Sequence, residues 1–388
     1  MHIFKNSSVR LLFAGLISAA FVSAGFFGTG IEFAWAVLPL IFALCCKTRL
    51  FRAVWTIPYF LGIGVIAGWG LVSMGSPIAL VTLLMLALSV ALTCLLVFAG
   101  TAVGLLVLAF VPFLPGHPFL ALGTIAPNGG FTAIMFAFIF VFVLEKLSRF
   151  SKGVAITGIV VCAALLWNLE AGWKYAAGFW IYQLAAEDVV STPQWVEVPV
   201  SYVPDVSDRL RSEMLRSAME PNGVYITGEN IVRSSDRLAL QSWCAFAQSN
   251  NVAVFLGVQE VETGRATVVL VQPDGECTGS NVVYAAWIGI PEITGSWTPF
   301  TPVAIDPQDQ VAQTRWLACF EGFSLAAWLK TALDRPRSVI IVSNDYWTEP
   351  LPVSNLRRKV SRNFERLFAL DVYHADAGRN LLKLGEKS

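Results

Sequence analysis

Polar residues stand at the ends of three short apolar runs in the second half of the chain, and they include a thiol and carboxylates. Glu229 follows "VYITG", Cys319 follows "RWLA", and Asn344 with Asp345 follows "VIIVS"; Glu321 comes two residues after the cysteine. A thiolate attacks acyl carbons, and a neighbouring carboxylate can take the thiol proton. There is also a purely structural interpretation. A cysteine on an apolar strand is often only a small buried side chain, and Glu229 could instead begin the helix expected after it.

The sequence does not support other common kinds of catalytic site. It contains no GxxxxGK[ST] loop, no GxGxxG after a strand and no GxSxG elbow. Histidine occurs only at His2, His117 and His374, and the first two belong to the apolar half, so a zinc hydrolase is not expected. We therefore predict a site that uses thiol and carboxylate chemistry, without a metal and without a cofactor.

The cysteines divide between an apolar half and a polar half of the chain. The second half holds Cys244, Cys277 and Cys319, an odd number at wide spacing. That pattern predicts no disulfide framework and no paired CxxC metal site, and at least one of these thiols must stay unpaired with the other two.

Composition indicates a polytopic membrane protein. Of 388 residues, 55% are hydrophobic and only 14% are charged, which is too apolar for an ordinary soluble protein of this size. Lys plus Arg and Asp plus Glu are each 27, so nothing predicts direct binding to nucleic acid. The apolar residues concentrate before about residue 180. We predict a transmembrane helical domain over 1–180 and a second domain over 194–388.

Apolar segments predict about seven membrane spans. The stretch 77–114 is too long for one crossing of a ~30 Å hydrocarbon core, and it divides plausibly near Gly100–Gly104. The other segments lie over 11–28, 32–46, 54–73, 131–146 and 154–172. The first also has signal-peptide features at "VSAG", and its removal would leave the later topology unchanged.

Basic residues predict the orientation, because Lys and Arg favour the cytoplasmic side. They precede the first span and follow the second and sixth, whereas the loops after the first, third and fifth spans carry none. If 77–114 were one span, the basic loop "EKLSRFSK" would fall outside. We therefore predict a multi-pass protein of a bacterial inner membrane, with a cytoplasmic N-terminus and a periplasmic second domain.

The second domain has an α/β pattern. Seven β-rich runs are separated by turn residues: "QWVEVPVSYV", "GVYIT", "VAVFLGVQEV", "ATVVLVQ", "NVVYAAWIGI", "RWLACF" and "SVIIVSN". Helical patterns are clearest in "SDRLALQSWCAFAQSN" and "SNLRRKVSRNFERLFAL". Alternation of this kind predicts a layered α/β domain large enough to bury its own core.

The segments "YITGEN", "ACFE" and "SNDYW" occur in an order that resembles the carbon–nitrogen hydrolase (nitrilase) superfamily. The resemblance implies an α-β-β-α sandwich in which Glu229 is the general base and Cys319 the nucleophile. It makes Glu321 a supporting carboxylate, and it places the residues of the "SNDYW" loop on the pocket wall: Asn344, Asp345 and Trp347. The aromatic residues of that loop could equally be core residues.

Membrane spans before such a domain resemble apolipoprotein N-acyltransferase. The shorter chain, and no apolar span after the second domain, are closer to the TraB conjugal-transfer proteins of rhizobial and agrobacterial plasmids. This resemblance implies a role in plasmid transfer, with acyl or amide transfer onto an envelope or pilus component. The expected partners are a membrane lipid or an envelope or pilus protein as substrate, and proteins of the transfer apparatus.

One departure from the family leaves catalysis open. The family's lysine segment aligns with "YAAWIGIP", residues 284–291, and the lysine position holds Ala286. Arg265 or Arg315 could replace the missing charge. The loss of one preorganised donor to an oxyanion costs ~10²–10³ in rate. A degenerate domain that serves as a binding or assembly module is therefore the alternative, and a full lipoprotein acyltransferase is a third.

Two further segments have open interpretations. The basic residues of the last helical pattern predict a solvated face of an amphipathic helix rather than an anion site: Arg357, Arg358, Lys359, Arg362 and Arg366. The loop "GTIAPNGGF", residues 123–131, lies on the predicted side of the second domain. It could line an entrance for a lipid or peptide, or it could be a simple turn.

Overall fold

A computed structural model of the chain describes twelve segments: residues 7–73, 76–109, 117–150, 195–200, 208–259, 266–273, 282–285, 314–334, 336, 338–344, 353–377 and 380–384. The chain forms two compact units that are not contiguous in sequence. The first contains Met1–Asp188, Phe323–Ala326 and Thr348–Ala369; the second contains Val189–Gly322, Ala327–Trp347 and Leu370–Ser388. A late segment of the chain thus belongs with the N-terminal helices.

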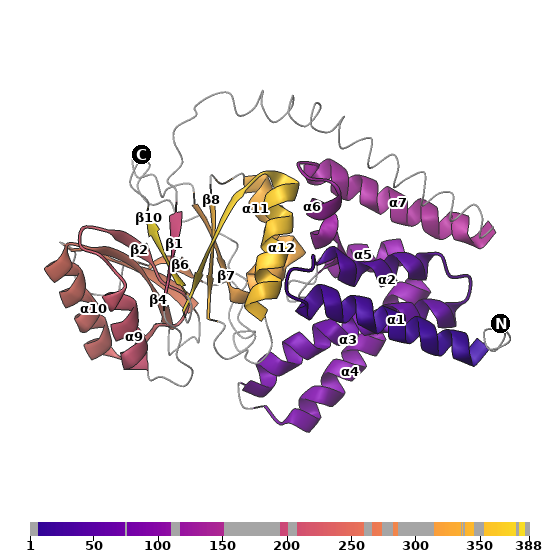
Figure 1. The fold of residues 1–388 in the computed structure, drawn as a ribbon, viewed down its shortest axis with the longest axis horizontal. Coiled ribbons are helices and arrows are strands. Elements are labelled where there is room, and N and C mark those ends of the chain that lie inside the picture. The colour runs from indigo at the N-terminus through magenta and orange to yellow at the C-terminus, as the bar shows by residue number, and fades with distance from the viewer. Residues whose placement is uncertain are drawn as a thin grey trace. The chain divides into compact units, whose positions relative to one another are not determined.

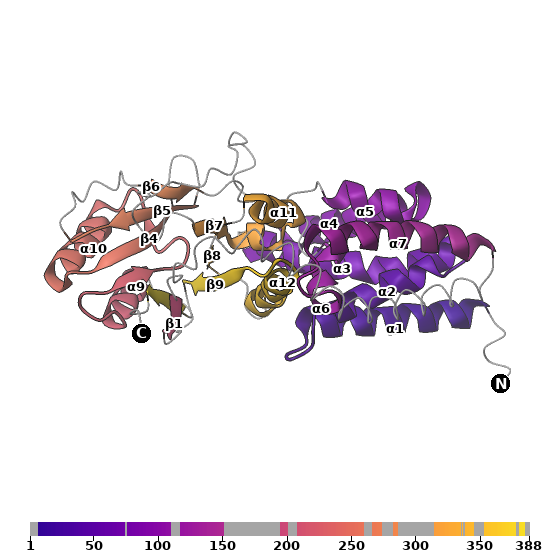
Figure 2. The same ribbon diagram turned by 90° about the horizontal axis from the view of Figure 1, so that it is seen from above.

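The first unit is helical. Helices α1 and α2 lie side by side in both views (Figure 1 and Figure 2). The described helices of this unit are α1 (Ser7–Phe27), α2 (Ala34–Leu44), α3 (Arg49–Ser73), α4 (Ile78–Cys94) with the π-helix η2 (Leu95–Ala99), α5 (Thr101–Ala109), the 3₁₀-helix η3 (Pro118–Ala121), α6 (Leu122–Ile125), α7 (Gly130–Phe150) and α12 (Val353–Phe368).

Three described helices are long and apolar enough to cross a membrane: Ser7–Phe27, Arg49–Trp69 and Ile78–Ala99. A fourth is possible if the pair Pro118–Ile125 and Gly130–Lys146, bent by 115°, counts as one span. The structure therefore does not support the seven-span prediction. The last predicted span, 154–172, lies outside the described residues.

One predicted span is too short as a helix. At 1.5 Å per residue, α2 with 11 residues covers ~16 Å, about half of a bilayer core. The helix is interrupted between η2 and α5 at Gly100, whose φ of 97 is a conformation that other residues rarely adopt. Apolar composition alone did not reveal the length of α2.

A buried ion pair joins the helices at one end of the helical unit. The Glu145 carboxylate, at the end of α7, accepts the Thr101 backbone N–H at 2.9 Å. Its other oxygen lies 3.5 Å from an Arg52 guanidinium nitrogen. Arg52 Nε in turn donates to the Cys46 carbonyl at 2.8 Å. The start of α3, the start of α5 and the end of α7 are therefore held together by a buried ion pair.

Helix α12 contacts the opposite ends of these helices. Lys359 Nζ donates to the Gly25 carbonyl at 3.0 Å and also to that of Gly28, which satisfies the last carbonyls of α1. Burial lowers the pKa of Lys359, and the nearby Glu32 carboxylate opposes that shift. Arg366 pairs with Glu32 at 3.3 Å.

The contact between α12 and α6 is close enough to involve backbone. A Cβ added to Gly123 would lie 1.7 Å from the Asn363 carbonyl oxygen. The Arg366 carbonyl accepts the Asn128 N–H at 2.6 Å. The predicted solvated basic face is confirmed only in part: Arg362 and Arg366 are exposed, whereas Arg357 is 1% exposed and Lys359 is part-buried. Part of the 123–131 loop is a docking surface for α12.

The second unit is built on a mixed sheet of ten strands. The strand order is β6-β5-β4-β2-β10-β9-β8-β7, with β1 paired to β10 and β3 to β4. The strands are β1 (Trp195–Pro199), β2 (Val224–Ile226), β3 (Val232–Arg233), β4 (Ala253–Gln259), β5 (Ala266–Val271), β6 (Val282–Ala285), β7 (Thr314–Ala318), β8 (Ser338–Ser343), β9 (Asp371–Asp376) and β10 (Asn380–Leu384). All seven predicted runs contain a strand. The prediction missed β3, β9 and β10, whose sequences carry charged or polar residues.

The sheet doubles back so that its two halves lie face to face. Strands β4 and β7 are five positions apart in the strand order, ~24 Å in a flat sheet. Yet the Phe255 and Trp316 rings lie 5.5 Å apart. Residues of both halves share one buried cluster, including Ile226, Ile340 and Ala375. The core of the unit therefore lies between two strand layers.

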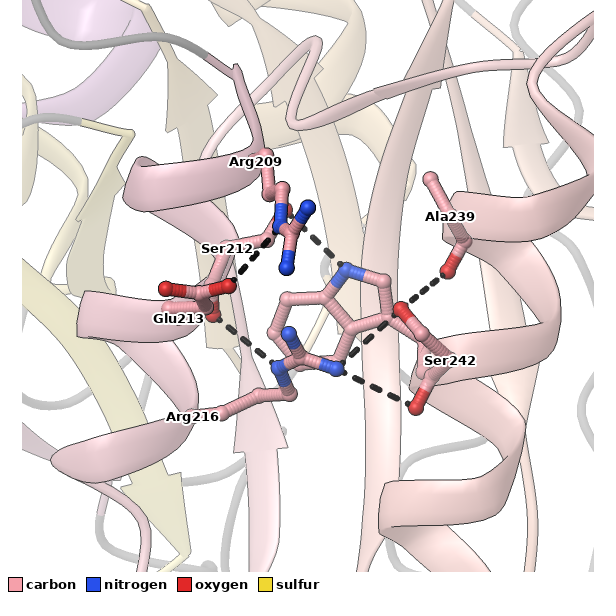
Figure 3. Close-up of polar contacts among 7 residues, drawn as sticks. Arg209, Ser212, Glu213, Arg216, Ala239 and Ser242 are labelled. Atoms are coloured by element: carbon pink, nitrogen blue, oxygen red, sulfur yellow. Dashed lines mark hydrogen bonds and ion pairs between the residues drawn. The ribbon is translucent and has the colours of Figure 1, made fainter.

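Helices α9 (Asp208–Ser217) and α10 (Arg237–Asn250) cover the other face of the β2–β4 half. Arg216 joins them (Figure 3): its guanidinium lies over the Trp243 ring at 5.4 Å and donates to the Ser242 carbonyl and hydroxyl at 3.2 and 3.1 Å. Trp243 Nε1 donates to the Ser212 hydroxyl at 3.4 Å. The indole is fully buried with its N–H satisfied.

Cysteine pairing differs in part from the prediction. Cys244 on α10 is disulfide-bonded, and its partner lies outside the described residues. Cys319 forms no disulfide, and at least one thiol of this half was expected to stay unpaired with the other two. Wide spacing does not prevent pairing, because a disulfide requires proximity in the fold and not in the sequence.

Candidate functional site

Cys319 lies where β7 ends. Strand β7 finishes at Ala318, and the 3₁₀-helix η5 (Cys319–Phe323) begins at the cysteine. The side chain is 9% exposed and forms no disulfide. Trp328 Nε1 on helix α11 (Leu325–Asp334) donates to the Gly322 carbonyl at 2.9 Å and holds the other end of this turn. The thiol therefore sits at a rigid corner rather than in the middle of a strand.

Glu321 stabilises that corner. Its Oε2 accepts the Ala318 backbone N–H at 2.8 Å, and its side chain is 3% exposed. A buried carboxylate that accepts a backbone N–H forms a charge-assisted hydrogen bond. Glu321 thus holds the residue directly before the cysteine, which suits the supporting role that the resemblance implies.

The neighbouring strand brings Asn344 to the same edge. β7 and β8 are parallel, with Ala318 opposite Val342, so Cys319 follows in register beside Ser343. Asn344 comes directly after Ser343 and is 5% exposed. Its Oδ1 is buried without a hydrogen-bond partner among the described residues. The rest of the predicted pocket wall, Asp345 and Trp347, lies outside them.

Glu229 reaches the same edge from the other half of the sheet. Its backbone N–H donates to the Ser343 carbonyl at 3.0 Å, and the Ala377 N–H donates to that same oxygen at 2.9 Å. Ser343 therefore ties the ends of β2, β8 and β9 together. The interpretation of Glu229 as a helix start is wrong, because Asp236 caps α10 by accepting the Ala239 N–H at 3.0 Å.

The chain around Glu229 leaves the sheet and returns to it. Six residue steps lead from Ile226 to Val232, but only three lead from their partners on β4, Phe255 to Val258. Three extra residues are therefore pushed out at this point. Such bulges commonly redirect side chains next to active sites.

Close backbone packing fixes this bulge. A Cβ on Gly228 would lie 2.0 Å from the Ala377 nitrogen, and one on Gly257 would lie 2.0 Å from the Gly228 oxygen. The buried Thr227 hydroxyl accepts the Gly257 N–H at 3.0 Å. These supporting residues were not among the predicted site residues. The "TGE" after a strand and the glycine inside "VAVFLGVQEV" were the available signals.

The structure does not bring Arg315, one of the two candidates to replace the family's lysine, to the site. Arg315 lies four residues before Cys319 on β7, so its Cα is ~13 Å away along the strand. Its neighbour Trp316 belongs to the core between the layers, so the Arg315 side chain takes the other face. Arg265 and Ala286 lie outside the described residues. Within the described part of the chain, no group of three His, Cys, Asp or Glu side chains could hold a metal ion.

These positions define a strand edge that carries Cys319, Glu321 and Asn344 and to which the Glu229 backbone is hydrogen-bonded. The thiol and the Glu229 carboxylate are the groups needed for acyl transfer through a thioester. No family model matches the chain, and no curated protein matches it. The interpretation of this edge therefore depends on its own geometry and on the motifs that carry it.

Proposed function

We propose that this chain is a bacterial inner-membrane protein that assists conjugal plasmid transfer through a carbon–nitrogen hydrolase-like domain in the periplasm. The domain would transfer an acyl or amide group by way of a Cys319 thioester. One observation carries the proposal. The Glu229 N–H bonds to the Ser343 carbonyl, and Cys319 stands in register beside that same residue.

The chemistry follows from those groups. Glu229 takes the proton of Cys319, and the sulfur forms a bond to the acyl carbon while the bond to the leaving group breaks. The leaving group takes the proton from Glu229. Water or an amine then attacks the thioester, gives up a proton to Glu229 and releases the thiolate, which recovers that proton. Glu321 keeps the cysteine corner in place during these steps.

The layer order supports the resemblance to the nitrilase fold. Helices α9 and α10 cover one outer face, and two strand layers follow. Helix α11, whose residues 327–334 belong to the same unit as the sheet, connects the parallel neighbours β7 and β8. Crossovers between parallel strands pack on the face of the sheet, which would complete an α-β-β-α sandwich.

The helical unit supports a periplasmic position for the domain. Arg52 and Glu145 meet at the end of the unit where the sequence carries Lys47, Arg49 and Lys146. Basic loops favour the cytoplasm. Helix α12 binds the opposite ends of the helices. The predicted span over 154–172, which lies outside the described residues, would return the chain from the basic side by its apolar composition.

The disulfide of Cys244 supports the same compartment. Disulfides persist in oxidising environments such as the periplasm and are rare in the cytosol. A periplasmic thiol site next to a membrane suits a membrane lipid or an envelope or pilus protein as substrate. Proteins of the transfer apparatus would be its partners.

The test is plasmid transfer from donor cells that carry variants of this chain. We expect Cys319→Ala and Glu229→Gln to abolish the contribution of the protein to transfer frequency, while the protein remains in the membrane at normal amounts. The matched control is Cys94→Ala, because Cys94 is an exposed free thiol of the helical unit. Normal transfer with Cys319→Ala would contradict the proposal.

A second function is favoured by one sequence observation. The aligned lysine position holds Ala286, and a site without that charge would turn over slowly. The domain would then be a non-catalytic binding or assembly module of the transfer apparatus. That function predicts normal transfer with Cys319→Ala and impaired transfer when surface residues near Glu229 and Asn344 are changed. Rescue of a strain depleted of apolipoprotein N-acyltransferase would instead favour the third function, lipoprotein acylation.

A further inference from the structure

Two buried amide oxygens next to the candidate site have no hydrogen-bond partner among the described residues. They are Oδ1 of Asn230, directly after Glu229, and Oδ1 of Asn344, directly after Ser343. A buried polar atom without a partner costs ~1–3 kcal/mol, so proteins rarely keep one without a reason. The fold by itself does not explain this pair.

Asn230 also has an unusual backbone conformation. Its φ is 57, in the left-handed region, where asparagine is tolerated and glycine is easier. Asn222 and Asn251 share this conformation with φ 63 and 52. Those two satisfy each other at the surface, because Asn251 Nδ2 donates to Asn222 Oδ1 at 2.8 Å. The conformation therefore does not require an unpaired oxygen, and Asn230 differs from them in this respect.

Backbone contacts place the two asparagines near each other. The residues before them are joined by the hydrogen bond from the Glu229 N–H to the Ser343 carbonyl. The residue after Asn230, Ile231, is fixed by a bond from its N–H to the Gly257 carbonyl at 2.9 Å. Asn230 thus lies in the middle of a bulge that is held on both sides, at the edge that carries Cys319.

We propose that Asn230 is a substrate-positioning residue that acts together with Asn344. Their two Oδ1 atoms would accept hydrogen bonds from one group of the substrate that carries polar hydrogens, beside the carbon that Cys319 attacks. This inference rests on the proposed function of Cys319 as a nucleophile. It also predicts a substrate specificity. A substrate whose group at this edge carries hydrogen-bond donors is preferred over a substrate whose group there carries none.

The probes are two small electrophiles that differ in donor hydrogens. Iodoacetamide carries a primary amide with two N–H groups, and methyl iodoacetate carries a methyl ester without donors. With either reagent the Cys319 sulfur forms a bond to the CH₂ carbon, the carbon–iodine bond breaks, and iodide leaves while Glu229 takes the thiol proton. The rate at Cys319 is measured by peptide mass in the full-length chain in its membrane. Each rate is divided by the rate of the same reagent with glutathione.

We expect wild-type Cys319 to prefer iodoacetamide by about three- to tenfold, the value of one or two neutral hydrogen bonds. The preference should fall toward one in Asn230→Gly, which keeps the backbone conformation, and in Asn344→Ala. It should persist in Asn230→Asp, which keeps an acceptor oxygen. Asn251→Gly is the matched control, since it makes the same change at the same conformation away from the site, and it should leave the preference unchanged.

Three results would overturn the inference. Wild-type Cys319 that reacts without a preference would overturn it and leave the proposed function intact. A preference that is equal in all variants would do the same. Cys319 that resists both reagents in folded protein would overturn the inference and the proposed function together. If Asn230→Gly does not fold, Asn344→Ala and Asn230→Asp still decide between these outcomes.

Discussion

Two regions of the molecule, the helix contacts of the helical unit and the strand edge of the sheet unit, can be compared by selected buried polar groups. In the helical unit, the buried hydroxyl of Ser89 donates to the Phe60 carbonyl at 3.0 Å, and Glu145 accepts the Thr101 N–H. In the sheet unit, buried polar groups near β2 and β8 fall into two sets. Thr227 and Glu321 are satisfied by backbone groups, whereas Asn230 and Asn344 each have a side-chain oxygen without a hydrogen-bond partner among the described residues.

The satisfied polar groups have a structural explanation, whereas the two oxygens without a partner in the described part of the chain do not. Polar groups that bridge helices, or that fix a turn, are explained by the need to satisfy the backbone in an apolar environment. Oxygens that remain unpaired at a strand edge are not explained in that way. Under our proposal, the edge with Glu229 and Cys319 is the functional region, and Asn230 and Asn344 belong to it. Changes in the helical unit should affect stability, and changes at the edge should affect chemistry.

The largest expected effect is in the helical unit. Glu145→Leu leaves the Arg52 guanidinium buried without its carboxylate and removes the acceptor of the Thr101 N–H. Breaking a buried ion pair on one side costs ~3–5 kcal/mol. We expect a loss of that size in the free energy of unfolding, measured by denaturant titration in detergent micelles.

The double variant Arg52→Met/Glu145→Leu is the control for this effect. Removal of both charges should recover a large part of the loss, because no unpaired charge remains. If the double variant is as unstable as Glu145→Leu, packing rather than charge pairing holds this end of the unit.

The next effect is at the bulge that carries Glu229. Gly257→Ala drives a Cβ to 2.0 Å from the Gly228 oxygen, so the bulge must move. Overpacking of this kind costs ~1–3 kcal/mol, and we also expect slower alkylation of Cys319 by iodoacetamide. Gly15→Ala is the matched control, because its Cβ meets only Val54 at an ordinary 3.6 Å. Unchanged Cys319 reactivity in Gly257→Ala would show that the conformation of the bulge does not affect the thiol.

A smaller effect is expected at the cysteine corner. Glu321→Gln keeps an oxygen that can accept the Ala318 N–H but removes the charge. A hydrogen bond to a charged group contributes about 1 kcal/mol more than a neutral one, so unfolding should become easier by about that amount. Calorimetry in detergent measures the change. Glu321→Ala, which removes the acceptor altogether, should cost more; equal costs would show that the hydrogen bond is not what matters.

The smallest effect is on the surface of the sheet unit. A hydrogen bond from Lys383, together with its charge, lowers the pKa of the exposed Glu220 carboxyl. Because the folded pKa is lowered, this stabilisation is present above the unfolded value of about 4.5 and is lost as pH falls through the folded value. Glu220→Gln should reduce the pH dependence of unfolding only in that acidic range. A difference at neutral pH alone would contradict this cause.

Much of the fold was predictable because apolar periodicity is a local signal. The runs that became β4, β5, β7 and β8 are rich in branched residues, and the α10 and α12 patterns are amphipathic. Strands β9 and β10 were missed because "DVYHAD" and "NLLKL" owe their pairing to neighbours rather than to β propensity. The span count failed because helix length depends on where turns form.

The candidate site was predictable only in part. Polar residues at strand ends indicated Glu229, Cys319 and Glu321, since such ends meet at one edge of a sheet. The bulge with Gly228 and Asn230 was not predictable, because it arises from the register between β2 and β4. The role of α12 was also hidden, since its carbonyl acceptors belong to α1, more than 300 residues earlier in the chain.

The most direct test of the proposed site, in which Glu229 and Cys319 act together, is the mass of the peptide that carries Cys319. The peptide is taken from protein purified gently from its native membrane. Glu229→Gln and Cys319→Ala variants are measured alongside. We predict a labile acyl mass on Cys319 that is absent in the Glu229→Gln variant, and the added mass would name the acyl donor. An unmodified Cys319 that also resists thiol reagents in folded protein would contradict the proposal that Cys319 and Glu229 form one catalytic site. The cysteine would then be a core residue, and the domain a non-catalytic module.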